Sequence, residues 1–182
     1  MRRPAAMLLF AALAATLPAL AQDTVPEPEG YRNDNYRAPV PATLSGARVV
    51  NGEEAAAIWR AGGAAFIDVL PRPPKPANLP AGTVWRDKPC LNIPGSHWLP
   101  DTGYGALAAA TEDYLKQGLA RATGGDKTKL LVVYCQASCW MSWNAAKRAL
   151  GFGYASVAWY PDGTDGWEAA DLPLVEAQPE PR

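Results

Sequence analysis

The stretch from Leu130 to Gly151 constrains the fold of this chain more than any other part of it. Its first five residues are apolar and rich in β-branched side chains, which is typical of a short buried strand. Further along, Trp143 and Leu150 fall on one face of a helix, for which Ser142 provides an N-cap and Gly151 a C-terminal stop. The sequence therefore predicts a buried strand, a loop and a helix in direct succession.

Two cysteines, Cys135 and Cys139, lie in the predicted loop. A loop between a buried strand and a helix N-terminus directs backbone N–H groups and the positive end of the helix dipole into one small volume. Such surroundings lower the pKa of a thiol, so we expect Cys135 to be acidic. A lone cysteine at a strand end is more often a small buried apolar residue, but a second thiol four residues later favours chemistry.

The first 21 residues have the features of a secretory signal peptide. Arg2 and Arg3 form a charged start, an apolar segment follows, and Ala-Leu-Ala at residues 19–21 is a small-x-small cleavage pattern. The apolar segment is shorter than the roughly 20 residues that span a bilayer. We therefore expect cleavage after Ala21, a periplasmic protein and no membrane association after cleavage.

Charge and cysteine content exclude some classes of partner. The chain has 17 basic and 18 acidic side chains with no basic cluster, so nucleic acid and anionic membrane surfaces are poor partners. Export places the three cysteines in an oxidising compartment, where disulfides persist. Because the count is odd, at least one thiol stays outside any intramolecular disulfide.

The segments outside the predicted domain have their own composition. Residues 22–48 are rich in Pro, Glu, Asp and Asn without periodicity, which predicts an extended N-terminal arm packed through its tyrosines, with disorder as the alternative. Residues 175–182 are polar and Pro-rich, which predicts a flexible C-terminal tail. Between them, residues 70–89 contain six prolines and form a loop of a length that is often functional.

The remaining segments alternate between helices and strands over residues 49–174. Such alternation predicts one α/β domain with a mainly parallel central sheet flanked by helices. In chain order we expect a helix over 53–60, a strand over 64–69, a turn over 92–100, a helix over 111–122, a strand over 155–160 and a turn over 161–167.

Four short motifs in this order resemble the rhodanese domain, over residues 49–174: Ile67-Asp68-Val69, Asn92-Ile93-Pro94-Gly95, Val132-Val133-Tyr134-Cys135, and Asp162-Gly163 with Gly166-Trp167. Within that superfamily, residues 31–39 and the Cys139-Trp140 step resemble exported proteins named for a CXXCW motif. Those proteins are associated with catabolism that depends on pyrroloquinoline quinone (PQQ). The resemblance implies a rhodanese-like sulfurtransferase of the periplasm linked to PQQ-dependent alcohol catabolism.

The same resemblance implies roles for individual residues. Cys135 would carry sulfur as a persulfide, held by backbone amides of a substrate-binding loop, and Asp68 would support that loop. Many family members end the loop with an arginine that would bind an anionic donor, whereas this chain has Trp140 there. The remaining residues of the implied loop are Gln136, Ala137 and Ser138, and Cys139 could attack the persulfide and close a disulfide.

The two thiols also allow a redox interpretation, in which Cys135 and Cys139 cycle between dithiol and disulfide. A bridge across so short a loop is strained and easily reduced. A permanent structural disulfide is the alternative, although a bridge that closes a small loop removes little entropy from the unfolded chain. Either way, the predicted catalytic residues are Cys135 and Cys139, and the predicted substrate is a small sulfur or thiol compound.

Two other hypotheses remain open. The protein could be a non-catalytic accessory module that binds a periplasmic quinoprotein dehydrogenase or its electron acceptor, such as a cytochrome, through the arm and the loop at 70–89. Alternatively, Cys90, His97, Cys135 and Cys139 could form a Cys3His zinc site. Their spacing matches no specific metal pattern, so we expect neither a metal nor a cofactor.

Overall fold

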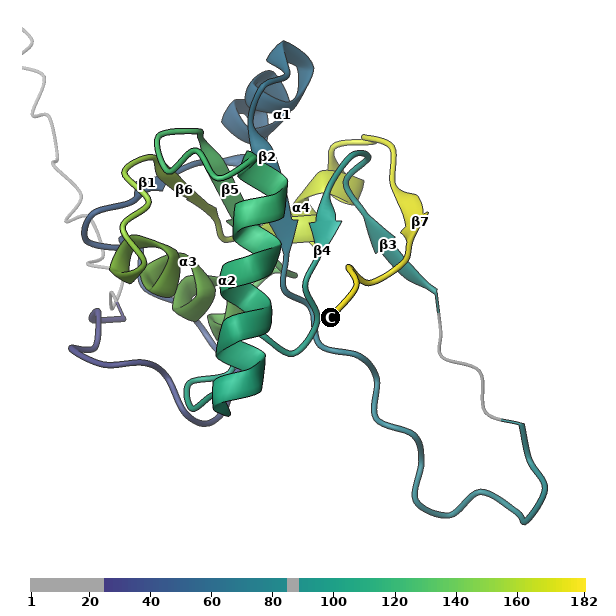
Figure 1. The fold of residues 1–182 in the computed structure, drawn as a ribbon. Coiled ribbons are helices and arrows are strands. Elements are labelled where there is room, and N and C mark those ends of the chain that lie inside the picture. The colour runs from purple at the N-terminus through teal and green to yellow at the C-terminus, as the bar shows by residue number, and fades with distance from the viewer. Residues whose placement is uncertain (1–24, 85–88) are drawn as a thin grey trace, which may run out of the picture.

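The computed structural model describes residues 25–84 and 89–182. The predicted signal peptide, residues 1–21, lies outside the described residues. The core is a five-stranded sheet whose neighbouring strands are all parallel, in the order β1-β6-β5-β2-β4 (Figure 1). Its strands are β1 (Arg48–Val49), β2 (Ala65–Asp68), β4 (His97–Trp98), β5 (Leu131–Tyr134) and β6 (Val157–Tyr160).

Helices cover both faces of this sheet, and its central strands are therefore buried on both sides. Alternate residues of a strand point to opposite faces, so Val133 packs in one apolar cluster and Val132 in the other. The first cluster includes side chains of α2 (Ala109–Thr123) and α3 (Trp140–Gly151), and the second includes side chains of α1 (Gly52–Ala61) and α4 (Gly163–Ala169). The predicted α/β fold with a parallel sheet between helices is confirmed.

The start of α3 differs from the prediction by three residues. Cys139, not Ser142, has the N-cap position, and its extended backbone (φ −120°, ψ 107°) leads into the first helical residue, Trp140. Ser142 lies in the first turn, where its hydroxyl donates to the carbonyl of Cys139 at 3.0 Å. The predicted cap was wrong because Trp140 and Met141 pack into the core as helical residues.

The C-terminal tail is docked, so the prediction of a flexible tail at 175–182 is wrong. Strand β7 (Val175–Ala177) pairs antiparallel with β3 (Cys90–Asn92) in a second, two-stranded sheet. Further on, the N–H of Glu180 donates to the carbonyl of Trp98 at 2.9 Å, and Tyr114 donates to the carbonyl of Glu180 at 2.9 Å. The tail thereby covers the outer edge of β4, whose unpaired backbone groups would otherwise face water.

The Pro-rich loop and the segment at 161–167 also bear on the predictions. The described part of the Pro-rich loop, residues 70–84, contains no helix or strand and is largely exposed. The segment expected as a turn at 161–167 instead opens α4. Within residues 25–84 and 89–182, no helix is long and apolar enough to cross a membrane.

The N-terminal arm is extended and free of helix from residue 25 to residue 47. It lies along α3 rather than apart from the domain, and apolar side chains such as Tyr36 and Val40 pack against the first cluster. The predicted extended arm is therefore confirmed in its described part.

Candidate active site

The two cysteines lie where the strands of the parallel sheet end. Cys135 directly follows β5, and Asp68 ends the neighbouring strand β2, opposite Tyr134. The loop from Cys135 then reaches Cys139 at the N-cap of α3. In open parallel sheets the carboxyl ends of the strands form the usual ligand-binding edge, so the fold brings the predicted residues Asp68, Cys135 and Cys139 to such an edge.

Both thiols are free and buried. Cys135 is 0% exposed and Cys139 is 2% exposed. Their side chains hydrogen bond to each other. Of the other predicted loop residues, Gln136 and Ala137 are half-buried and Ser138 is exposed, with a positive φ of 52° that places it in the left-handed region.

The hydrogen bond between the thiols separates their acidities. The Cys135 thiol, together with backbone N–H groups of Met141 and Gln136 and the charge of Arg37, lowers the pKa of Cys139 to about 6. Burial, and then the hydrogen bond to Cys139, raises the pKa of Cys135 well above its usual value. The prediction of an acidic Cys135 is therefore wrong, and the acidic thiol is the one at the N-cap of α3.

Hydrogen bonds hold the loop against α4 and the arm. The N–H of Ala137 donates to the Asp165 carboxylate at 3.2 Å, and the N–H of Trp140 donates to the carbonyl of Tyr36 at 2.9 Å. Two of the loop amides that a persulfide on Cys135 would need are thus engaged elsewhere. Gly163 makes the contact with α4 feasible, because a Cβ at that position would lie 2.4 Å from the carbonyl oxygen of Cys135.

Asp68 is a buried carboxyl beside the thiols. Burial raises the pKa of Asp68 to about 8, although the N–H of Leu70 donates to its Oδ1 at 2.7 Å. Its Oδ2 lies 4.0 Å from the sulfur of Cys90, and its charge also interacts with that of Cys139. Asp68 therefore interacts both with the dithiol and with the third cysteine, and its role in supporting the loop stays a prediction.

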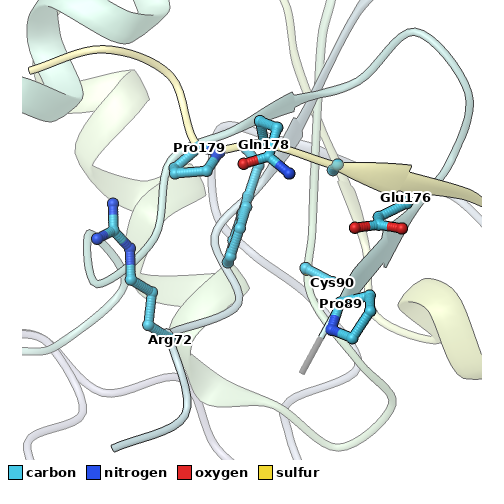
Figure 2. Close-up of a pocket in the computed structure, with 8 residues that line it drawn as sticks. Arg72, Pro89, Cys90, Glu176, Gln178 and Pro179 are labelled. Atoms are coloured by element: carbon cyan, nitrogen blue, oxygen red, sulfur yellow. The ribbon is translucent and has the colours of Figure 1, made fainter. Parts of the chain in front are cut away.

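Cys90 itself faces a different part of the molecule. Its thiol donates to Oδ1 of Asn92 at 3.1 Å, and burial raises the pKa of Cys90 to about 12. It lines a cavity of about 350 Å³ beside the small sheet, together with Arg72 and Glu176 (Figure 2). Neither Cys135 nor Cys139 lines this cavity.

The structure does not assemble the Cys3His zinc site. His97 contacts the tail instead, with its Nδ1 2.6 Å from the carboxylate of Glu180. Among the residues that the structure describes, no group of three or more His, Cys, Asp or Glu side chains is arranged to hold a metal ion.

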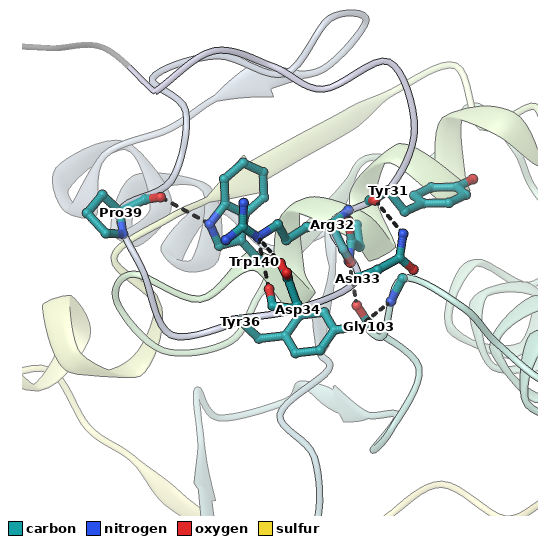
Figure 3. A network of polar contacts seen from close by, with 10 residues as sticks. Tyr31, Arg32, Asn33, Asp34, Tyr36, Pro39, Gly103 and Trp140 are labelled. Carbon is teal, nitrogen blue, oxygen red and sulfur yellow. Dashed lines mark hydrogen bonds and ion pairs between the residues drawn. The ribbon is translucent and has the colours of Figure 1, made fainter.

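The arm covers the start of α3, as Figure 3 shows. The indole N–H of Trp140 donates to the carbonyl of Pro39 at 3.0 Å, and the guanidinium of Arg32 lies 5.3 Å from the centre of the Trp140 ring. Asn144, one turn further along α3, accepts from the N–H of Arg32 and donates to its carbonyl, each at 2.9 Å. Trp140, predicted as a substrate-binding residue, is 2% exposed and serves here to hold the arm.

Sequence reasoning missed the residues of the arm that reach the site. Arg37 forms an isolated antiparallel bridge with Cys139, and Tyr36 accepts the hydrogen bond from the Trp140 amide. One signal was available in the sequence: Asn144 stands among the apolar residues Trp143, Ala145 and Ala146 of the predicted helix. The structure shows that it is fully buried, and a buried amide needs hydrogen-bond partners. The sequence did not show that these partners lie more than a hundred residues away in the arm.

Comparisons with known proteins agree with this architecture. Residues 86–170 match the sequence model of the rhodanese-like domain family. A search of curated proteins found no match. Solved structures with the same fold include the thiosulfate sulfurtransferase of Pseudomonas aeruginosa, with 20% identity and a TM-score of 0.50 over 74% of this chain and 21% of that one.

Two further structures resemble this chain. A persulfide form of EanB, solved with ergothioneine, has 18% identity and a TM-score of 0.51 over 78% of this chain and 34% of that one. The polysulfide-sulfur transferase of Wolinella succinogenes has 18% identity and a TM-score of 0.45 over 74% of this chain and 82% of that one. This chain thus spans only a minor part of the first two proteins. It has a rhodanese-like α/β fold, and its residues 86–170 carry the sequence of a rhodanese-like domain.

Proposed function

We propose that this protein acts on small sulfur or thiol compounds through the Cys135–Cys139 dithiol, with Cys139 as the attacking thiolate and Cys135 as the resolving thiol. The observation that supports this proposal is the place of Cys139 as a buried thiol at the N-cap of α3, beside a second buried thiol, Cys135. The interaction of the two thiols lowers the pKa of Cys139 and raises that of Cys135. A thiolate is the nucleophilic form of cysteine, and Cys139 is the thiol that is ionised near neutral pH. Cys135, buried and protonated beside it, is placed to complete an internal exchange.

The chemistry proceeds in two balanced steps. The Cys139 thiolate attacks the outer sulfur of a donor, the bond between that sulfur and the rest of the donor breaks, and the electron pair leaves with the remainder. Cys135 then loses its proton and attacks the inner sulfur of the Cys139 persulfide. A disulfide forms and the outer sulfur leaves as hydrosulfide, so the two thiols are oxidised and the transferred sulfur is reduced. A second thiol compound, acting as reductant, restores the dithiol.

This order of attack reverses the roles that the family resemblance implies. A persulfide on Cys135 would need the loop amides around it, but the amides of Ala137 and Trp140 donate to Asp165 and Tyr36. A persulfide on Cys139 would instead lie at the N-terminus of α3, near the N–H of Met141. The positive end of the helix dipole favours an anion there.

The test is to trap the first intermediate with thiosulfate as donor. In Cys135→Ser the internal attack is lost, so mass spectrometry should find one added sulfur atom on Cys139 and little released sulfide. Cys139→Ser should form no persulfide, and Cys90→Ser should behave as the unchanged protein because Cys90 is not part of the exchange. A persulfide on Cys135 in the Cys139→Ser variant, or no persulfide and no sulfide release in any variant with either thiosulfate or an organic hydropersulfide, would refute the proposal.

The proposed location is the periplasm, and the proposed pathway is PQQ-dependent alcohol catabolism. Support comes from the signal-like residues 1–21 and from the resemblance of residues 31–39 and of Cys139-Trp140 to the CXXCW-motif proteins. Fractionation of cells that express the full chain with a C-terminal tag tests the location. Growth of a deletion strain on an alcohol that requires a PQQ-dependent dehydrogenase tests the pathway.

A second candidate is an accessory module that binds a periplasmic quinoprotein dehydrogenase or a cytochrome. The favouring observation is that both thiols are buried while the Pro-rich loop is open, with Val84 80% exposed. Complementation of the deletion strain separates the two candidates. A catalyst requires Cys139, whereas an accessory module retains full function in Cys139→Ser and loses it when residues 73–83 are replaced by a Gly/Ser linker of equal length.

A further inference from the structure

Arg37 lies directly opposite Cys139. The two residues form an antiparallel bridge between the arm and the loop, and the hydrogen bond from Trp140 N–H to the Tyr36 carbonyl joins the residues on either side of it. This pattern makes Arg37 and Cys139 a non-hydrogen-bonded pair, the type in which opposed side chains are closest. Opposed side chains lie on the same face, so the Arg37 side chain starts beside the thiol.

Arg37 also differs from Cys139 in its access to water. Arg37 is exposed, whereas Cys139 is 2% exposed. In residues 25–84 and 89–182, no carboxylate lies within ion-pair distance of Arg37, while the neighbouring Arg32 is paired with Asp34 at 3.1 Å. Arg37 thus offers an exposed guanidinium, without a described carboxylate partner, whose charge acts on the buried sulfur of Cys139.

Among the described residues, the other titratable groups that act on Cys139 or respond to its charge are not cations. Cys135 donates a hydrogen bond to it from the end of β5, Asp68 faces it from β2, and Tyr104 faces it from the segment before α2. Asp68 and Tyr104 both have a raised pKa, chiefly because of burial, so they are neutral near pH 7. Arg37 is the cation whose charge acts on Cys139.

We propose that Arg37 binds the anionic group of the sulfur substrate in front of Cys139, so that the arm completes the substrate site. The inference rests on the proposed function and adds the substrate class, which is a small anionic sulfur compound such as thiosulfate or an acid-bearing persulfide. A guanidinium suits this task because its N–H groups bind oxyanions in a bidentate manner. Since Cys139 is nearly buried, the substrate enters through a local shift at the Arg37–Cys139 bridge.

The kinetic test compares an anionic donor with a neutral one. Arg37→Gln should raise the half-saturating concentration of thiosulfate by about tenfold or more. The neutral reagent dimethyl trisulfide converts a thiolate to its methyl mixed disulfide and releases methyl persulfide, and the rate of this reaction at Cys139 should change less than about twofold. Arg37→Lys should recover most of the loss. Arg60→Gln, which removes the same charge from an exposed position on α1, should match the unchanged protein. Equal effects of Arg37→Gln on both donors, or no effect on either, would overturn the inference.

A second test does not depend on turnover. Thiolate absorbance at varied pH measures the pKa of Cys139. The titration is repeated with sulfate, an unreactive anion, in place of chloride at the same ionic strength. Sulfate bound at Arg37 should raise this pKa in the unchanged protein and leave it unaltered in Arg37→Gln. The same response in both proteins would refute anion binding by Arg37. Absence of persulfide with every donor, alongside an Arg37-dependent sulfate response, would instead refute the proposed function alone.

Discussion

The hydrogen bond between Cys135 and Cys139 sets the charge state of both thiols. Because Cys135 donates, its proton stays on the more buried sulfur, and the negative charge lies on Cys139 beside the first amides of α3. The position of the helix start decides this outcome. With the N-cap at Ser142, as the sequence suggested, neither cysteine would lie at the end of the helix; with the N-cap at Cys139, one does.

The buried Asp68 carboxyl should make the stability of the protein depend on pH. Its carboxyl has a folded-state pKa of about 8, above its ordinary value of 3.8, so below pH 3.8 it is neutral in both the folded and the unfolded chain. Between pH 4 and pH 8 the unfolded chain ionises and the folded one does not, which lowers the stability by up to about 1.4 kcal/mol per pH unit. Asp68→Asn removes this loss while keeping an acceptor for the N–H of Leu70.

The expected result is a difference in free energy of unfolding, variant minus unchanged protein, that rises from pH 4 to pH 8 and then levels off. Urea unfolding at a series of pH values measures it. Asp171→Asn, at an exposed position, should show no such trend. A difference that is constant with pH would show that Asp68 is ionised in the folded protein.

Part of the site follows from the sequence and part does not. The strand, the loop and both thiols are local features, so spacing and apolar pattern were enough to find Cys135 and Cys139. Which thiol is acidic depends on the helix start and on burial, which are set by packing. Arg37 and Tyr36 reach the loop from about a hundred residues away, and no local pattern reports such a contact.

At the scale of elements, one face of α3 holds the arm. Residues spaced by about one turn make the contacts: the amide of Asn144 bonds to the backbone of Arg32, and the Lys147 ammonium donates to the carbonyl of Glu29 at 2.7 Å. The Arg148 guanidinium lies 4.0 Å from the centre of the Tyr31 ring. A helix that binds an extended strap through backbone groups needs such polar residues on a buried face.

We therefore expect Asn144→Ala to loosen the arm over the dithiol. The change removes two hydrogen bonds to Arg32 and a third, at 3.0 Å, to the carbonyl of Gly103. Each such loss costs on the order of 1 kcal/mol, so the arm should open at least about tenfold more often. The alkylation rate of Cys139 should rise by the same factor, as peptide mass spectrometry can measure.

Cys90 is an internal control for this experiment, because it lies beside the small sheet and should be alkylated at an unchanged rate. Lys116→Ala on α2 breaks exposed ion pairs with Glu112 and Asp113 and a contact with the Phe152 ring, away from the arm, and should alter neither rate. Equal acceleration at Cys90 and Cys139 would mean that Asn144→Ala loosens the whole domain rather than the arm.

At the scale of the whole molecule, the alternation of strands and helices determines the fold. The buried strands β2, β5 and β6 were visible in the sequence because β5 and β6 are continuous apolar runs and β2 is interrupted only by Asp68 at its end. Two helix layers follow from burial on both faces. The small sheet was not visible. Strands β3 and β7 have only three residues each and pair across more than eighty residues, so neither has a pattern long enough to detect.

The docked tail should contribute to global stability. Deleting residues 178–182 removes the hydrogen bonds of Glu180 to Trp98 and Tyr114 and uncovers the edge of β4. A loss of about 2 kcal/mol corresponds to a fall in Tm of roughly 4–8 °C for a chain of this size. Tyr114→Phe, which removes one of these bonds, should lower Tm by about half as much. An unchanged Tm after the deletion would show that the tail is not docked in solution.

The most direct test of the account is the pH titration of thiolate absorbance in the fully reduced protein. We predict a step with a midpoint near pH 6 that disappears in Cys139→Ser and persists in Cys135→Ser, whose hydroxyl can still donate to the thiolate. In Cys135→Ala the step should move to higher pH, because alanine has no donor. A step that disappears in Cys135→Ser and persists in Cys139→Ser would contradict the assignment of Cys139 as the nucleophile. The absence of any ionisation below the ordinary thiol pKa of about 8.5 would contradict the activated dithiol altogether.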